Sequence, residues 1–152
     1  MDSLIWTRGR EDWAHDLVVL KKSQQPFLHL PCIHTELLEI RPKDIPVHFD
    51  AWIFTSPKAI AAIQNDQSLS PLMAKVRQAY TFGIETSAAA ERCGFDVERY
   101  TEVGTGEEFA SALCQTLVEG AVVCWPSARE VAFDVTVPLQ ASGIKCIAIL
   151  VY

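Results

Sequence analysis

Apolar runs and helix-spaced apolar positions alternate along the last two thirds of the chain. The continuous apolar run Ala51–Thr55 is typical of a buried strand, and Pro57–Ile63 is typical of a helix. The later predicted segments are strands at Tyr80–Phe82, Val97–Tyr100, Ala121–Trp125 and Lys145–Val151 and helices at Glu85–Cys93, Gly106–Leu117 and Arg129–Ala141. Strict alternation favours a parallel sheet, because parallel strands need crossover helices. We therefore expect an α/β fold with a flavodoxin-like wound parallel five-stranded sheet. The third of these helices contains β-branched residues and Pro138, which disfavour it.

The first 50 residues follow a different pattern. The predicted segments there are a strand at Leu4–Arg8, a helix at Asp12–Lys22, a short strand at Pro26–Leu30 and a mixed stretch at Pro31–Ile40 that is a candidate strand. Pro42 and Pro46 then indicate a linker over Arg41–His48. We divide the chain into an N-terminal strand–helix portion (1–40), a hinge (41–50) and an α/β domain (51–152). Because an edge strand without a neighbour seeks a partner, we expect the first portion to pack apart from the sheet or against a second copy, as a homodimer.

Composition narrows the classes of partner. The net charge is −6 and 49% of the residues are hydrophobic, so the chain is predicted to be globular, with no nucleic-acid partner and no anionic membrane surface. No run is long enough to span a bilayer. The cysteines are five in number and scattered, which is typical of free thiols in the cytoplasm. The Cys32-Ile33-His34 cluster is too sparse for zinc, so we expect no metal.

Three strand–turn–helix junctions carry the candidate chemistry. Ser56 can cap a helix that has Pro57 at its first position, Gly83 and Thr86 lie at a second helix start, and Ser127–Arg129 follows a third strand. A helix start offers free backbone N–H groups and a partial positive charge, which hold carboxylates or phosphates. All three turns follow strands, so they are predicted to share the carboxyl edge of the sheet. At each turn the alternative is purely structural: a helix cap or a tight turn.

The order of these motifs resembles the uroporphyrinogen-III synthase family. The chain has a first strand that ends in Thr7-Arg8, then Phe54-Thr55-Ser56-Pro57-Lys58-Ala59-Ile60, then Gly83-Ile84-Glu85-Thr86 opening a helix that closes at Gly94, and a last strand that ends in Val151-Tyr152. Each motif is weak alone, but their order and spacing are fairly specific. The resemblance covers the whole chain.

The resemblance implies two α/β domains joined by a two-strand hinge, with the N-terminal strand and helix belonging to an incomplete first domain. Tyr152 lies where the family chain would cross back to finish that domain, so about half of the family pattern is missing. We expect the chain to be a fragment or a shortened relative, with little activity alone. The flavodoxin-like domain at 51–152 corresponds to the complete second domain of the family.

The resemblance also implies a substrate and a set of site residues. The substrate is hydroxymethylbilane, a linear tetrapyrrole with acetate and propionate side chains, which is cyclised with inversion of the last ring and without a cofactor. Tyr152 is the candidate catalytic residue, since a phenol can help the leaving hydroxyl depart as water. The candidate substrate-binding residues are Thr7, Arg8, Thr55, Ser56, Lys58, Gly83, Thr86, Ser127 and Arg129.

Two other classes of function stay open from the residues alone. A flavodoxin-like binding module would have a longer phosphate loop after its first strand, whereas Thr55–Lys58 is short and lacks glycine. A phosphoacceptor receiver would have paired acids at its strand ends, which this chain lacks. A catalytically inactive truncated relative with a structural role is the other alternative, and the missing half favours it.

Overall fold

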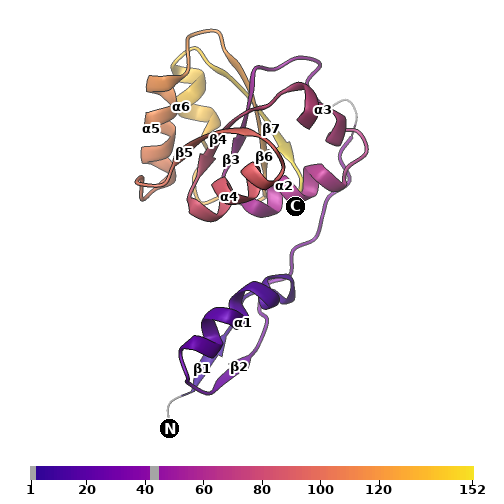
Figure 1. The fold of residues 1–152 in the computed structure, drawn as a ribbon. Helices are drawn as coiled ribbons and strands as arrows, with labels where there is room; N and C mark the ends of the chain where they lie inside the picture. Colours follow the sequence, from indigo (N-terminus) through magenta and orange to yellow (C-terminus); the bar gives the residue numbers. More distant parts are fainter. Residues whose placement is uncertain (1–2, 42–44) are drawn as a thin grey trace. The chain divides into compact units, whose positions relative to one another are not determined.

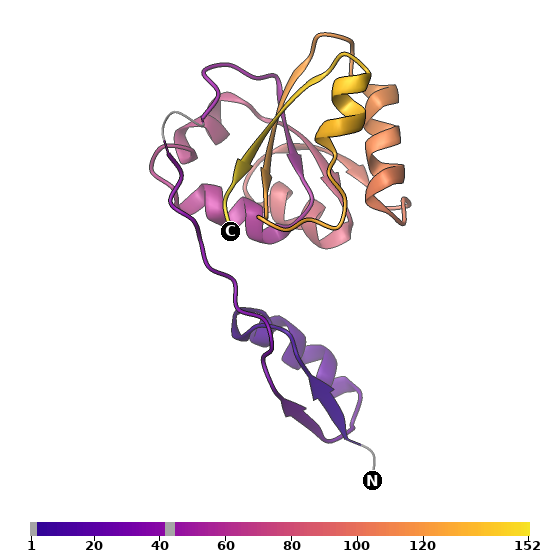
Figure 2. The same cartoon turned by 180° about the vertical axis from the view of Figure 1, so that it is seen from behind.

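The computed structural model describes residues 3–41 and 45–152. The chain divides into two compact units, Met1–Glu36 and Leu37–Tyr152, which are drawn from opposite sides in Figures 1 and 2. No helix in the described part of the chain is long and apolar enough to cross a membrane. Residues 42–44 of the predicted linker lie outside the described residues.

The larger unit contains one parallel sheet with the strand order β5-β4-β3-β6-β7. The strands are β3 (Ala51–Phe54), β4 (Gln78–Phe82), β5 (Asp96–Tyr100), β6 (Val122–Ser127) and β7 (Lys145–Leu150). The expected wound five-stranded parallel sheet is therefore confirmed. If the strands of this unit are numbered from β3 as strand 1, their order along the sheet is 3-2-1-4-5. Flavodoxin itself has the order 2-1-3-4-5. The winding changes direction between β3 and β6.

Helices cover both faces of this sheet. They are α2 (Pro57–Asn65), α3 (Ser70–Lys75), α4 (Ile84–Arg92), α5 (Gly106–Thr116) and α6 (Thr136–Ala141). One core contains Trp52 and Phe54 of β3 with the buried residues of α2 and α4, and the other contains Ala51 and Ile53 with those of α5 and α6. Figures 1 and 2 show α5 beside α6 and both on the face opposite α2 and α4. Successive residues of a strand point to opposite faces, and helices cover both faces here. Every side chain of β3 is therefore buried.

The smaller unit has a separate sheet of two parallel strands. β1 (Leu4–Trp6) pairs with β2 (Phe27–His29), and η1 (Arg10–Asp12) and α1 (Trp13–Lys22) connect them. The N-terminal strand therefore does not join the larger sheet, as expected. Among the side chains described in this unit, Leu20 is the one apolar side chain that is fully buried. Seven large apolar side chains are exposed instead: Leu4, Ile5, Val18, Val19, Leu28, Leu30 and Ile33.

Three local expectations need correction. The predicted helix over Arg129–Ala141 begins only at Thr136, because the Asp134 carboxylate accepts hydrogen bonds from the backbone N–H (2.9 Å) and the hydroxyl (2.6 Å) of Thr136. The preceding β-branched residues remain in a loop. The stretch Pro31–Ile40 forms no strand. The sequence also gave no sign of α3, which follows a turn in which Asp66 accepts from two backbone N–H groups.

Gly106 marks a close approach between α5 and the loop before α6. A Cβ added there would lie 2.7 Å from the Cβ of Phe133, which is too close for two carbon atoms. We expect Gly106→Ala to lower the free energy of unfolding by about 1–3 kcal/mol in urea denaturation. Gly104→Ala is the matched control, since its Cβ would meet only a Glu108 carboxylate oxygen at 3.5 Å. Equal unfolding midpoints for the two variants would contradict this account of the contact.

Candidate functional site

Three turns of the larger unit lie at one edge of its sheet. Thr55–Lys58 follows β3, Gly83–Thr86 follows β4 and Ser127–Arg129 follows β6. Strands β4, β3 and β6 are parallel neighbours, so their carboxyl ends meet at the same edge. The structure thus brings together seven of the nine predicted binding residues. Open wound sheets bind ligands at this edge, where the winding changes direction.

The turn after β3 is built around the start of α2. Ser56 has an extended backbone, and its hydroxyl oxygen accepts a hydrogen bond from the backbone N–H of Lys58 (3.1 Å). Pro57 occupies the first helical position, where it has no N–H to leave unpaired. No acidic residue lies in the first turn of α2. The positive end of the helix dipole and the half-buried Lys58 therefore act with the same sign.

The turn after β4 depends on backbone conformation. Gly83 has a φ of 86° and open space where a Cβ would point, so glycine is required by the left-handed backbone and not by packing. α4 begins without a side-chain cap. Thr86 is 4% exposed, and the neighbouring Ser87 hydroxyl donates to the carbonyl of Gly83 (2.9 Å). A ligand contact by the Thr86 hydroxyl stays a prediction.

The turn after β6 is tied to the end of the chain. The backbone N–H of Arg129 donates to the carbonyl of Tyr152 (2.8 Å), and the N–H of Val151 donates to the carbonyl of Ser127 (3.0 Å). These bonds place Tyr152, the candidate catalytic residue, at the same edge as the three turns. Ser127 is buried, whereas the side chain of Arg129 is exposed. Of this turn, Arg129 is thus the residue whose side chain is accessible to a carboxylate.

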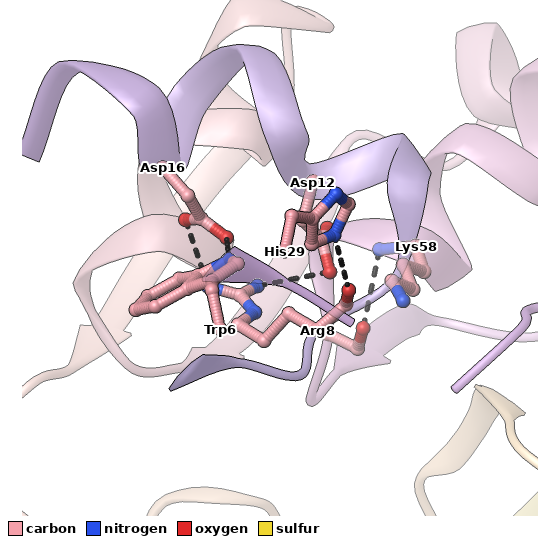
Figure 3. A network of polar contacts seen from close by, with 7 residues as sticks. Trp6, Arg8, Asp12, Asp16, His29 and Lys58 are labelled. Carbon is pink, nitrogen blue, oxygen red and sulfur yellow. Dashed lines mark hydrogen bonds and ion pairs between the residues drawn. The ribbon is translucent and has the colours of Figure 1, made fainter. Parts of the chain in front are cut away.

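Thr7 and Arg8 lie in the smaller unit, at the end of β1. The Arg8 guanidinium pairs with Asp12 (3.2 Å) and with Asp16 (3.1 Å), whose carboxylate also accepts from the indole N–H of Trp6 (3.1 Å; Figure 3). His29 donates from Nε2 to the carbonyl of Arg8 (3.0 Å). Because two carboxylates balance its charge, Arg8 attracts a further anion less strongly than an unpaired arginine would. A substrate contact by Thr7 or Arg8 stays a prediction.

The remaining titratable groups restrict the chemistry. Burial raises the pKa of the Cys124 thiol, and it raises that of Cys146 to about 12, so both are protonated at neutral pH and are poor nucleophiles. Within the described residues, no group of His, Cys, Asp and Glu side chains is arranged to hold a metal ion. The groups at this edge are hydrogen-bond donors, the exposed Arg129, Lys58 and Tyr152. Such an arrangement suits the binding and proton-assisted reaction of a carboxylate-rich molecule.

Trp125 is a residue of this edge that sequence reasoning missed. It lies in β6, is 3% exposed, and donates from its indole N–H to the hydroxyl oxygen of Thr55 at 3.2 Å. The signal in the sequence was a tryptophan near the end of a predicted strand. Its partner is 70 residues away, so only the pairing of β3 with β6 reveals the contact.

The fold and this edge define a doubly wound α/β domain whose strand ends suit an anionic ligand. The family model of uroporphyrinogen-III synthase HemD matches residues 18–152, and the chain belongs to that family. Comparison with curated proteins finds no match.

Two solved structures show a similar fold. The uroporphyrinogen III synthase of Thermus thermophilus is 15% identical with a TM-score of 0.53, and the match covers 100% of this chain and 62% of that one. The uroporphyrinogen-III synthetase of Helicobacter pylori 26695 is 20% identical with a TM-score of 0.52, and the match covers 98% of this chain and 61% of that one. The chain therefore spans about three fifths of the length of these structures.

The burial of the thiols generates a test of the β6–β7 core. We expect Cys32, which is exposed, to react first with a thiol reagent such as Ellman's reagent in the native protein. Cys124 and Cys146 should react only after unfolding in urea, because burial both shields them and holds them protonated. Mass mapping of the labelled cysteines before and after unfolding measures this. Early labelling of Cys124 in the native state would show that the core around β6 opens.

Proposed function

We propose that this chain is part of a uroporphyrinogen-III synthase of tetrapyrrole and haem biosynthesis, with the larger unit as one wall of its substrate site. Family membership supports the reaction class. The observation that carries the proposal is the convergence of three strand ends on one edge, with two helix starts, Lys58 and Arg129. These donors match a substrate with many carboxylates. Local dipoles and a few cationic side chains can outweigh a net charge of −6 at one edge.

In this proposal the chain holds hydroxymethylbilane in one conformation. Loss of the terminal hydroxyl breaks a C–O bond, and the Tyr152 phenol assists by giving a proton so that water leaves. The substituted carbon of the far ring attacks the resulting azafulvene, and the new C–C bond makes that carbon a spiro centre. The original C–C bond at this carbon then breaks, and the freed bridging carbon bonds to the unsubstituted α-carbon of the same ring, which inverts that ring. The proton lost from the α-carbon restores the phenol of Tyr152. Holding a flexible substrate so that only one closure is possible provides most of the selectivity. No cofactor, metal or nucleic acid takes part, and free cysteines fit a cytoplasmic setting.

The smaller unit has an apolar surface of its own that is exposed to solvent. Ile5 and Leu28 are paired neighbours across β1 and β2 and are 62% and 54% exposed. An apolar surface of this kind marks an interface. We propose that a second copy covers it, giving a homodimer. The alternative is that the chain is a catalytically inactive relative. An assay of the uroporphyrinogen isomers that it forms distinguishes the two possibilities.

The first prediction of this proposal concerns isomers. At low protein concentration we expect hydroxymethylbilane to close mainly to isomer I. Closure there is spontaneous and leaves the last ring uninverted. If a second copy completes the cleft, the fraction of isomer III rises with protein concentration. Chromatographic separation of the oxidised products measures both. Isomer I alone at every concentration would favour the inactive relative.

The second prediction concerns Lys58. We expect Lys58→Ala to weaken binding of a carboxylate-rich porphyrin such as uroporphyrin III by about 1.5–3 kcal/mol, through loss of one charge-assisted contact. Lys75→Ala is the matched control, because it removes the same charge from the end of α3, away from the carboxyl edge. Calorimetric titration of both folded variants decides. Equal affinities would move the site away from α2.

The sequence also predicts weaker binding for Thr86→Ala. Because its side chain is 4% exposed, that variant tests whether the hydroxyl or only the backbone N–H of Thr86 contacts the ligand.

A further inference from the structure

The hydrogen bond between Trp125 and Thr55 joins the two strands at which the winding of the sheet changes direction. Trp125 belongs to β6 and Thr55 follows β3, its direct neighbour. The indole is 3% exposed and packs in the core beneath α5 and α6, so its N–H has a fixed direction. The Thr55 side chain is only half-buried. A buried indole N–H therefore holds the hydroxyl of a half-buried residue.

This contact fixes the chemical role of the Thr55 hydroxyl. An indole N–H can only donate, so the oxygen of Thr55 is the acceptor (3.2 Å) and its own proton must point elsewhere. Within the described residues, the structure shows no acceptor for that proton. An oxygen that already accepts a hydrogen bond is also a stronger donor, because hydrogen bonds in a chain polarise one another. Thr55 therefore presents a donor, and a carboxylate is an acceptor only.

The neighbouring hydroxyl has the complementary role. Ser56 uses its oxygen to accept from the backbone N–H of Lys58 and so begins α2. Of two adjacent hydroxyls, that of Ser56 therefore caps the helix and that of Thr55 is held by Trp125. An explanation from stability alone is that Thr55 merely satisfies the buried indole N–H. If Thr55 only satisfies the indole N–H, loss of that N–H leaves ligand affinity unchanged. If the indole orients Thr55 toward the ligand, the same loss weakens binding.

We infer that Trp125 is a positioning residue, which orients the Thr55 hydroxyl to donate a hydrogen bond to a carboxylate of the tetrapyrrole. This inference rests on the proposed function and adds two assignments to it: the donor role of Thr55 and the dependence of that role on Trp125. Trp125 itself does not contact the substrate. Its effect on binding passes entirely through Thr55.

Calorimetric titration with uroporphyrin III tests the inference. We expect Thr55→Val to weaken binding about tenfold, as for one hydrogen bond to a charged group, and Thr55→Ser to retain affinity. Trp125→Phe keeps an aromatic ring but removes the N–H, and it should weaken binding by about threefold to tenfold. The double variant should be no weaker than Thr55→Val alone, because both changes remove the same contact.

A matched control separates positioning from stability. Trp52 also loses one indole hydrogen bond when changed to Phe, to the carbonyl of Val76 (3.0 Å), which precedes β4 at the opposite edge. We expect Trp52→Phe to lower the urea midpoint without changing affinity for the porphyrin. An unchanged affinity in Trp125→Phe, or additive losses in the double variant, would overturn the inference while leaving the proposed site intact. Absence of porphyrin binding by the unaltered chain would instead overturn the proposed function.

Discussion

Burial of β3 on both faces is the constraint on which the larger unit depends. Its four side chains alternate between two cores, so helices must cover both faces, and the crossover helices that do so make the neighbouring strands parallel to it. Parallel pairing in turn places the ends of β4, β3 and β6 at one edge. The turns that follow them are therefore brought together by the same burial that stabilises the sheet. The nearness of the three turns is thus a consequence of the winding.

In the smaller unit, by contrast, a helix accompanies the two-stranded sheet but most of the large apolar side chains are exposed. A buried carboxylate, Asp16, is held by Trp6 and Arg8, so polar contacts provide part of the order that a core would otherwise provide. The arrangement explains why Arg8 is paired within its own unit. Seven large apolar side chains of this unit therefore remain in contact with solvent.

Sequence patterns predicted those features of the fold that local physics determines. The continuous apolar run at Ala51 and the Ser56-Pro57 helix start need no tertiary information, and both are found as expected. The predicted start of α6 was wrong because Asp134 accepts hydrogen bonds from Thr136, in a local turn that helix periodicity does not reveal. The burial of Thr86 depends on how α4 packs against the sheet. No local pattern contains that information.

The electrostatics of the helix starts decide which of them suits an anion. α5 follows β5 but has Glu107 and Glu108 in its first turn, and Glu108 accepts from the backbone N–H groups of Gly104 and Thr105, so its N-terminal end is already occupied by its own acids. α4 has Glu85 in its first turn. α2 has no acid there, and Lys58 adds a charge of the same sign as the dipole. Thr55 lies directly before the cap of α2, so the orientation that we infer for its hydroxyl applies at this junction. Among the strand–helix junctions described here, this is the one where the helix dipole, a lysine and a hydroxyl all favour an anionic ligand.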